Sequence, residues 1–152
     1  KRFTVHKLKV DKVITIENKA SYLAYIKKHN REKELAVYLA GFYSPVKKFF
    51  LEKIWDFVRV NSPETKFFHW GDIDLGGFKI FLQVQKSIPQ VQPFLMDVDT
   101  LRKYAVYGDQ IDDAYRKELA ALLEKPEYRI FSPVVKEILH LGIKLEQEAI
   151  EI

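Results

Sequence analysis

Residues 66–78 read KFFHWGDIDLGGF, an aromatic run followed by two acids and two glycines. Residues 67–70 predict a buried strand, and a helix is expected over residues 76–86. Asp72 and Asp74 lie between these two elements. Because side chains alternate along an extended chain, both carboxylates project to the same side and can approach one ion.

A second apolar stretch also ends at an acid. Residues 13–16 read VITI, which predicts a short strand, and Glu17 follows directly. If the two strands are parallel neighbours, Glu17 joins Asp72 and Asp74 at the carboxyl edge of the sheet, where open α/β sheets place their sites. Clustered carboxylates repel one another unless a cation is present, and oxygen-only ligation suits Mg²⁺ or Mn²⁺. We therefore expect these three acids to be the metal ligands and the catalytic residues.

The rest of the chain alternates between strands and helices. Strands are predicted at 13–16, 35–39, 67–70 and 94–96, with Gly41 closing the second, and helices at 20–29, 45–58, 76–86 and 101–107, with a polar turn over 30–33. This order predicts an α/β fold, with a mostly parallel four-stranded sheet and helices on both faces. After Gly108 only helices are predicted, at 115–123 and 133–141. We expect one domain over 1–152, with a core at about 10–108 and a helical C-terminal extension at about 109–152.

Composition narrows the class of protein. The chain has 152 residues, the usual size of one domain, and it contains no cysteine, which excludes disulfides and cysteine-ligated zinc. No apolar run is long enough to cross a membrane. A cytoplasmic protein without membrane contact is therefore expected. Because the chain begins with Lys1, we also expect it to be the C-terminal fragment of a longer protein.

Positive charge is concentrated near the beginning of the chain. Residues 1–33 contain ten lysines and arginines against three acids, whereas the remainder contains 15 basic and 18 acidic residues. A basic end beside an acidic site suits a polyanion such as DNA, held by its phosphates near a metal. An ordinary lysine-rich surface is the alternative interpretation.

Further residues near the acids are candidates for lesser roles. Lys19 and Lys79 could hold a phosphate, or they could be ordinary surface lysines. Gly76 and Gly77 could let a phosphate approach the helix N-terminus, or they could serve a tight turn. The secondary acidic candidates are Asp97, Glu146 and Glu148, for which turn or solvated positions are the alternatives.

At these motifs the chain resembles a known family. Glu17 at the end of one strand, and Asp72 and Asp74 at the end of another before glycine, resemble the Toprim domain of topoisomerases, primases and nucleases. More specifically, ITIENK at residues 14–19 and HWGDIDLGGF at residues 69–78 resemble the C-terminal domain of the JetD family, the nuclease subunits of Wadjet anti-plasmid systems. Residues 145–148, LEQE, also resemble the end of that family. The DNA-cleaving subunit of topoisomerase VI is more distantly similar.

The resemblance implies an activity and partners. It implies Mg²⁺- or Mn²⁺-dependent cleavage of double-stranded DNA beside a condensin-like motor complex, with the N-terminal DNA-binding region absent from this sequence. Since both DNA strands must be cut, a homodimer is expected. Two alternatives stay open. One is a protein like the topoisomerase VI subunit, which cleaves DNA through a tyrosine, and the other is an inert module that docks DNA or a partner.

Overall fold

The fold is built on a parallel sheet of four strands. A computed structural model of the chain describes residues 3–29, 33–40 and 44–152, so Gly41 and most of the predicted turn at 30–33 lie outside the described residues. The strands lie in the order β2 (Glu34–Tyr38), β1 (Lys12–Ile16), β3 (Lys66–Trp70) and β4 (Gln92–Pro93), and all pairs are parallel. The predicted α/β class and parallel sheet are therefore confirmed.

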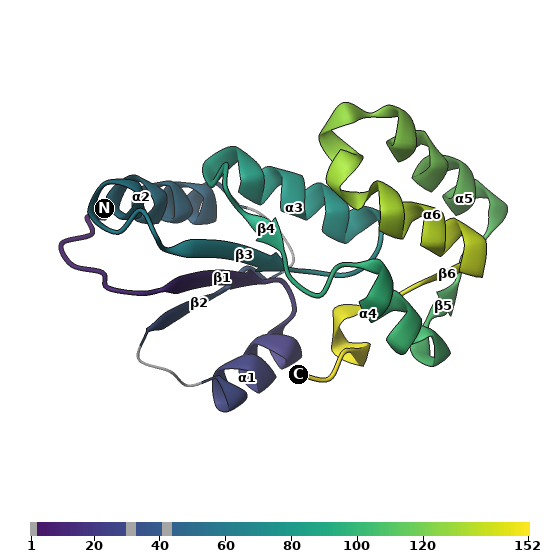
Figure 1. Ribbon diagram of the computed structural model, residues 1–152, viewed down its shortest axis with the longest axis horizontal. Helices are drawn as coiled ribbons and strands as arrows, with labels where there is room; N and C mark the ends of the chain where they lie inside the picture. Colours follow the sequence, from purple (N-terminus) through teal and green to yellow (C-terminus); the bar gives the residue numbers. More distant parts are fainter. Residues whose placement is uncertain (1–2, 30–32, 41–43) are drawn as a thin grey trace.

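Helices cover both faces of this sheet. In Figure 1, α2 (Pro45–Asn61) and α3 (Leu75–Ser87) lie over one face, and α1 (Lys19–Lys28) lies over the other. Each helix begins at a residue whose side chain accepts a backbone hydrogen bond from the first turn, namely Asn18, Ser44 and Asp74. Such caps satisfy amide groups that have no partner within the helix, so they define where each helix starts.

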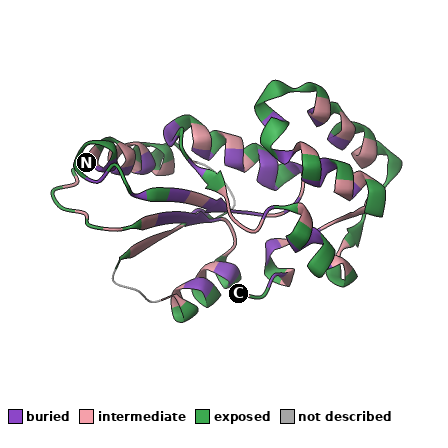
Figure 2. Cartoon of the chain, viewed as in Figure 1, coloured by how far each residue is buried: buried purple, intermediate pink, exposed green. Residues whose placement is uncertain are grey.

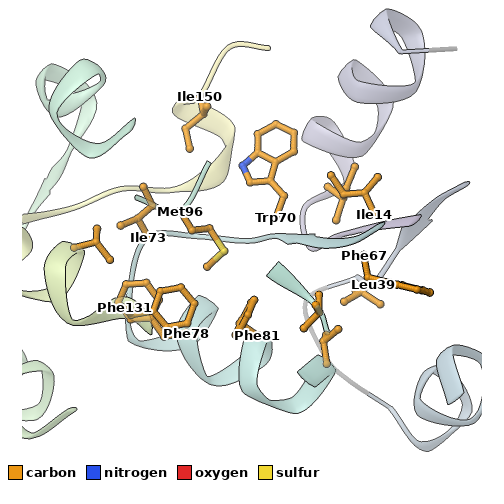
Figure 3. Close-up of a cluster of buried hydrophobic side chains, with 14 of the residues drawn as sticks. Ile14, Leu39, Phe67, Trp70, Ile73, Phe78, Phe81, Met96, Phe131 and Ile150 are labelled. Atoms are coloured by element: carbon orange, nitrogen blue, oxygen red, sulfur yellow. The ribbon is translucent and has the colours of Figure 1, made fainter. Parts of the chain in front are cut away.

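Burial of the central strands follows from this layering. Val13 to Ile16 of β1 are buried without alternation, as expected for a strand covered on both faces. The central strands are accordingly among the most buried parts of the chain in Figure 2. Trp70 and Ile150 lie on one side of the sheet, and Phe78 and Phe81 lie on the other (Figure 3). The core therefore has two layers, and the layer that contains Trp70 also includes Ile150, near the end of the chain.

The fourth strand differs from its prediction. The sequence predicts it over residues 94–96, but the structure has a two-residue strand at Gln92–Pro93. Leu95 adopts a φ of 54°, a left-handed conformation that cannot continue a strand. The next helix, α4 (Val98–Lys103), starts earlier than the predicted 101–107, because the Asp97 carboxylate caps it by accepting from the Thr100 N–H at 2.8 Å. A 3₁₀ turn, η1 (Ala105–Tyr107), completes the predicted range.

The C-terminal part is mainly helical and packs against α3. It contains α5 (Asp113–Ala120), the 3₁₀ helices η2 (Ala121–Glu124) and η3 (Pro126–Phe131), and α6 (Ser132–Leu141). The Phe131 ring stacks on Phe78 with 4.4 Å between centroids and meets Phe81 edge-on at 4.9 Å. Within the described residues, no helix is long and apolar enough to span a bilayer.

A small two-stranded sheet in this part was not predicted. β5 (Asp109–Gln110) pairs antiparallel with β6 (Ile143–Lys144), and strands of two residues carry no detectable periodicity. Beyond β6 the chain returns to the sheet, where Ile73 and Leu145 exchange backbone hydrogen bonds of 2.8 and 3.2 Å. The final turn, η4 (Gln147–Ala149), therefore lies beside the ends of β1 and β3.

Candidate active site

Glu17 and Asp72 meet at the carboxyl edge of the sheet, as predicted. Ile16 and Trp70 are paired in the β1–β3 register, so the chain leaves both strands at the same level. The Glu17 N–H donates to the Trp70 carbonyl at 3.1 Å. A Cβ added at Gly71 would lie 2.6 Å from Glu17 Oε2, so a larger residue here would displace this carboxyl group.

Glu17 is the most strongly perturbed acid of the group. Burial raises the pKa of Glu17 to about 8, and the negative charges of Asp72, Asp74 and Glu146 contribute to the rise, against a hydrogen bond from the backbone of Asp72. Its buried Oε2 has no hydrogen-bond partner within the described residues. Because buried polar atoms are normally paired, this oxygen is suited to a proton or a cation.

Asp72 has a similar but milder shift. Burial raises the pKa of Asp72 to about 6, and the charges of Asp74 and Glu146 add to this effect. Two interactions oppose it, a 2.7 Å hydrogen bond from the Gln147 N–H to Oδ1 and the positive charge of Lys144. The two neighbouring acids therefore hold protons more tightly than isolated carboxyl groups do.

Asp74 belongs to the same electrostatic group and also caps α3. Its Oδ1 accepts from the Gly77 N–H at 2.7 Å, so this carboxylate caps the N-terminus of the helix. A Cβ at Gly77 would lie 2.1 Å from the Asp72 carbonyl oxygen, so this glycine permits a close backbone approach. Gly76 is exposed. Close packing against the Asp72 backbone therefore explains why position 77 is a glycine. Phosphate binding by the two glycines stays a prediction.

The secondary acidic candidates separate into two kinds. The charge of Glu146 raises the pKa of both Glu17 and Asp72, so Glu146 belongs to the acidic group. Asp97 caps α4 at its exposed start, and Glu148 accepts a hydrogen bond from the Asn18 side chain.

The two candidate lysines are exposed. Lys19 is the first residue of α1, directly after the Asn18 cap. Lys79 lies on α3 and borders a hollow that it shares with Lys86, Glu127 and Tyr128. Phosphate contacts by these lysines stay predictions.

Comparison with known proteins assigns the family. The family model "Wadjet protein JetD, C-terminal" matches residues 1–152. The chain belongs to this family. The Wadjet protein JetD of Bacillus cereus (strain Q1) is 32% identical over 141 residues, which cover 92% of this chain and 34% of that protein. This JetD-family chain therefore spans about a third of the length of its curated relative, and the JetD resemblance inferred from the sequence is confirmed.

Three residues of this JetD-family site were missed by the sequence analysis. Lys144 Nζ lies 2.8 Å from Glu146 Oε1 and 3.9 Å from Asp109 Oδ2, and its charge lowers the pKa of Asp72. Tyr115 and Gln147 are the other two. Only the likeness of residues 145–148 to the end of the family pointed to this part of the chain.

Tyr115 touches the start of α3 beside the acids. Its hydroxyl oxygen accepts from the Leu75 N–H at 2.9 Å. Burial raises the pKa of Tyr115 to about 12, and the charges of Asp74 and Glu146 act in the same direction. This tyrosine is therefore held as a neutral phenol, which is the opposite of what an activated nucleophile requires.

The chemistry of the donor groups suits a divalent cation. Within the described residues, no three histidine or acidic side chains are arranged so that they could hold a metal ion together as they stand. The charges of Asp74 and Glu146 nevertheless raise the pKa of Glu17 and of Asp72, and Glu17 carries a buried oxygen without a partner. A hard cation with oxygen ligands would relieve both the repulsion and the missing contact. By donor chemistry, Glu17 and Asp72 therefore fit Mg²⁺ or Mn²⁺, with Asp74 and Glu146 adding negative charge.

Proposed function

We propose that this chain is the nuclease domain of a JetD-type protein and hydrolyses DNA phosphodiesters with Mg²⁺ or Mn²⁺. The observation that supports this most directly is the pair formed by Glu17 and Asp72. These acids come from adjacent parallel strands, and burial raises the pKa of the two carboxyl groups to about 8 and about 6. Perturbed acids of this kind are typical of catalytic sites.

The residues have separable roles in this proposal. Bound Mg²⁺ or Mn²⁺ would supply positive charge to neutralise the scissile phosphate. Asp72, held by the Gln147 N–H, and Glu17 would be its ligands. In the metal-free site the pKa of Glu17 is about 8, so this residue would release a proton near neutral pH when the cation binds. Asp74 holds the start of α3 and adds negative charge beside them.

The biological setting is proposed from the family. The curated relative is a Wadjet protein, which supports a role for this chain in anti-plasmid defence. We accordingly propose double-stranded DNA as the substrate and a condensin-like motor complex as the partner. A second copy of the protein would supply the second cut, because one site cleaves one strand at a time.

Plasmid cleavage by the full-length protein tests the activity. Supercoiled plasmid is incubated with protein and Mg²⁺ or Mn²⁺, and nicked and linear products are measured. Glu17→Gln and Asp72→Asn should each lower the cleavage rate by roughly a hundredfold or more, the size expected when a metal ligand is lost. Asn at position 72 keeps an oxygen that can accept from the Gln147 N–H, so that contact is retained.

Asp97→Asn is the matched control, because Asp97 is also an aspartate whose Oδ1 accepts a backbone N–H, but it lies at the exposed start of α4. This variant should cleave at the wild-type rate. The double variant Glu17→Gln/Asp72→Asn should be little slower than either single variant, because one loss already disables the site. Retained cleavage in both single variants would contradict the proposal. Protein attached covalently to the DNA ends would indicate the topoisomerase-like alternative instead.

A further inference from the structure

Gln147 is a buried polar side chain at the acidic edge that makes two hydrogen bonds. It lies in η4 with 0% of its surface exposed. Its Oε1 accepts from the Asn18 N–H at 2.9 Å, and its Nε2 donates to the Trp70 carbonyl at 3.1 Å. Burying a glutamine costs side-chain entropy and desolvation, and these two hydrogen bonds offset that cost.

These two bonds connect the ends of two strands. Asn18 follows Glu17 after β1, and Trp70 is the last residue of β3, two residues before Asp72. The Trp70 carbonyl accepts from both the Glu17 N–H and Gln147 Nε2, each at 3.1 Å. One amide group therefore spans the gap between the backbone that carries Glu17 and the backbone that carries Asp72.

The backbone of Gln147 adds a direct contact with an acid. Its N–H donates to Asp72 Oδ1 at 2.7 Å, which fixes that carboxylate relative to the same residue. Just before it in the chain, Leu145 exchanges two backbone hydrogen bonds with Ile73, so the C-terminal segment is itself anchored to the chain between Asp72 and Asp74. The position of Gln147 is therefore set independently of its side chain.

We propose that Gln147 is a positioning residue that sets the separation of the Glu17 and Asp72 carboxylates, so that the two bind one divalent cation together. This inference rests on the proposed function, because it assumes that a cation binds at this edge. Groups that orient metal ligands commonly contribute about 10- to 100-fold to metal affinity. Gln147 touches neither metal nor substrate in this role, and it acts through the two strand ends.

Manganese affinity of the full-length protein tests the inference without requiring activity. Free Mn²⁺ is measured by electron paramagnetic resonance for the wild type and for Gln147→Met, which keeps the length of the side chain but removes both hydrogen bonds. The variant should bind Mn²⁺ roughly tenfold more weakly. Gln83→Met, at an exposed position of α3, is the matched control and should bind as the wild type does.

A second control separates positioning from general stability. Val58→Ala removes buried side-chain atoms near the end of α2, which leads into the start of β3, and should lower stability while leaving Mn²⁺ affinity unchanged. A folded Gln147→Met protein that binds Mn²⁺ as tightly as the wild type would overturn the positioning role while the proposed function stood. Absence of Mn²⁺ binding by the wild type would instead overturn the proposed function, and the cation-positioning role with it.

Hydrogen–deuterium exchange of the wild type provides a test that does not depend on whether the variant folds. Mn²⁺ should slow amide exchange in peptides covering residues 17–18, 72–74 and 145–148 together, because one connected unit is ordered by the ion. In Asp72→Asn, Mn²⁺ should slow all three much less. A wild-type protein in which Mn²⁺ protects 17–18 and 72–74 but leaves 145–148 unchanged would overturn the role of Gln147.

Discussion

At the scale of single residues, the site contains two acids, Glu17 and Asp72, that burial keeps protonated to a higher pH than free carboxyl groups. Burial and the charges of neighbouring acids raise the pKa of Glu17 to about 8. Nearby, His69 is fully buried, and this burial lowers its pKa to about 3. Its Nδ1 pairs with Thr15 Oγ1 at 2.8 Å. The edge of the sheet is therefore an environment that disfavours ionised groups, and a bound cation would reverse this for the acids.

The pH dependence of stability should report Glu17. The unfolded glutamate ionises near pH 4.5, whereas the folded one keeps its proton up to about pH 8, so folding takes up a proton and stability falls as pH rises through this range. His69 affects stability at lower pH. Its pKa is about 3 in the folded protein and 6.5 in the unfolded one, so its contribution lowers stability only as pH falls below 6.5. Asp72, with a folded pKa of about 6, is largely ionised in both states above pH 6.5.

We therefore expect the Tm of the metal-free protein to fall between pH 6.5 and pH 8. Glu17→Gln should flatten this decline, because glutamine carries no proton to lose. Thermal melts in a chelator measure the effect, and Glu148→Gln, at an exposed acid, is the control. An equal decline in the wild type and in Glu17→Gln would show that another group is responsible.

At the scale of elements, the C-terminal helices share one core with the sheet. η3 contributes Phe131, which is fully buried against Phe78 and Phe81 of α3. The α3 helix is in turn the element that follows the two aspartates and is capped by Asp74. Packing at η3 therefore supports the element whose start lies at the acidic edge.

Phe131→Ala should lower the free energy of unfolding by about 3–5 kcal/mol, the usual cost of emptying a buried phenylalanine site. Ile130→Ala is the matched control, because Ile130 is its neighbour in η3 and 47% exposed, and it should cost less than about 1 kcal/mol. Urea unfolding followed by circular dichroism measures both. A separate early transition in Phe131→Ala would mean that the extension unfolds independently of the sheet.

At the scale of the whole molecule, α1 starts beside the acidic edge and carries positive charge at its other end. This helix follows shortly after Glu17 and carries Lys27 and Lys28, both exposed, in its last turn. Residues 1–33 as a group hold ten basic residues and three acids. A DNA backbone held by such lysines would be retained without reading the base sequence.

DNA binding by the full-length protein should be independent of sequence and should weaken steeply with salt. Lys27→Gln/Lys28→Gln should reduce the slope of log affinity against log salt by about 1 to 2, since each lost phosphate contact removes about 0.9. Fluorescence anisotropy at several salt concentrations measures the slope. Lys117→Gln/Lys125→Gln, at exposed lysines of the C-terminal part, is the charge-matched control. An unchanged slope in the α1 variant would exclude these two lysines from the DNA contact.

The sequence by itself determined the sheet and the principal acids. Strands at β1 and β3 and the acids after them are local patterns, because apolar runs and strand-end carboxylates lie within a few residues of one another. Parallel pairing then follows from the alternation of strands and helices, and it brings Glu17 to Asp72. The position of β4 was missed because the left-handed conformation of Leu95 leaves no trace in hydrophobic periodicity.

Only the tertiary structure decided how the acids are held. The Gln147 contacts join residues 75 and 129 positions apart in the chain, and no local pattern encodes which distant amide reaches a strand end. The pKa of Glu17 likewise depends on burial and on charges from Asp72, Asp74 and Glu146, which lie far from Glu17 in the sequence. Local periodicity specifies the elements, whereas hydrogen bonds and desolvation at their ends arise only when topology brings distant residues together.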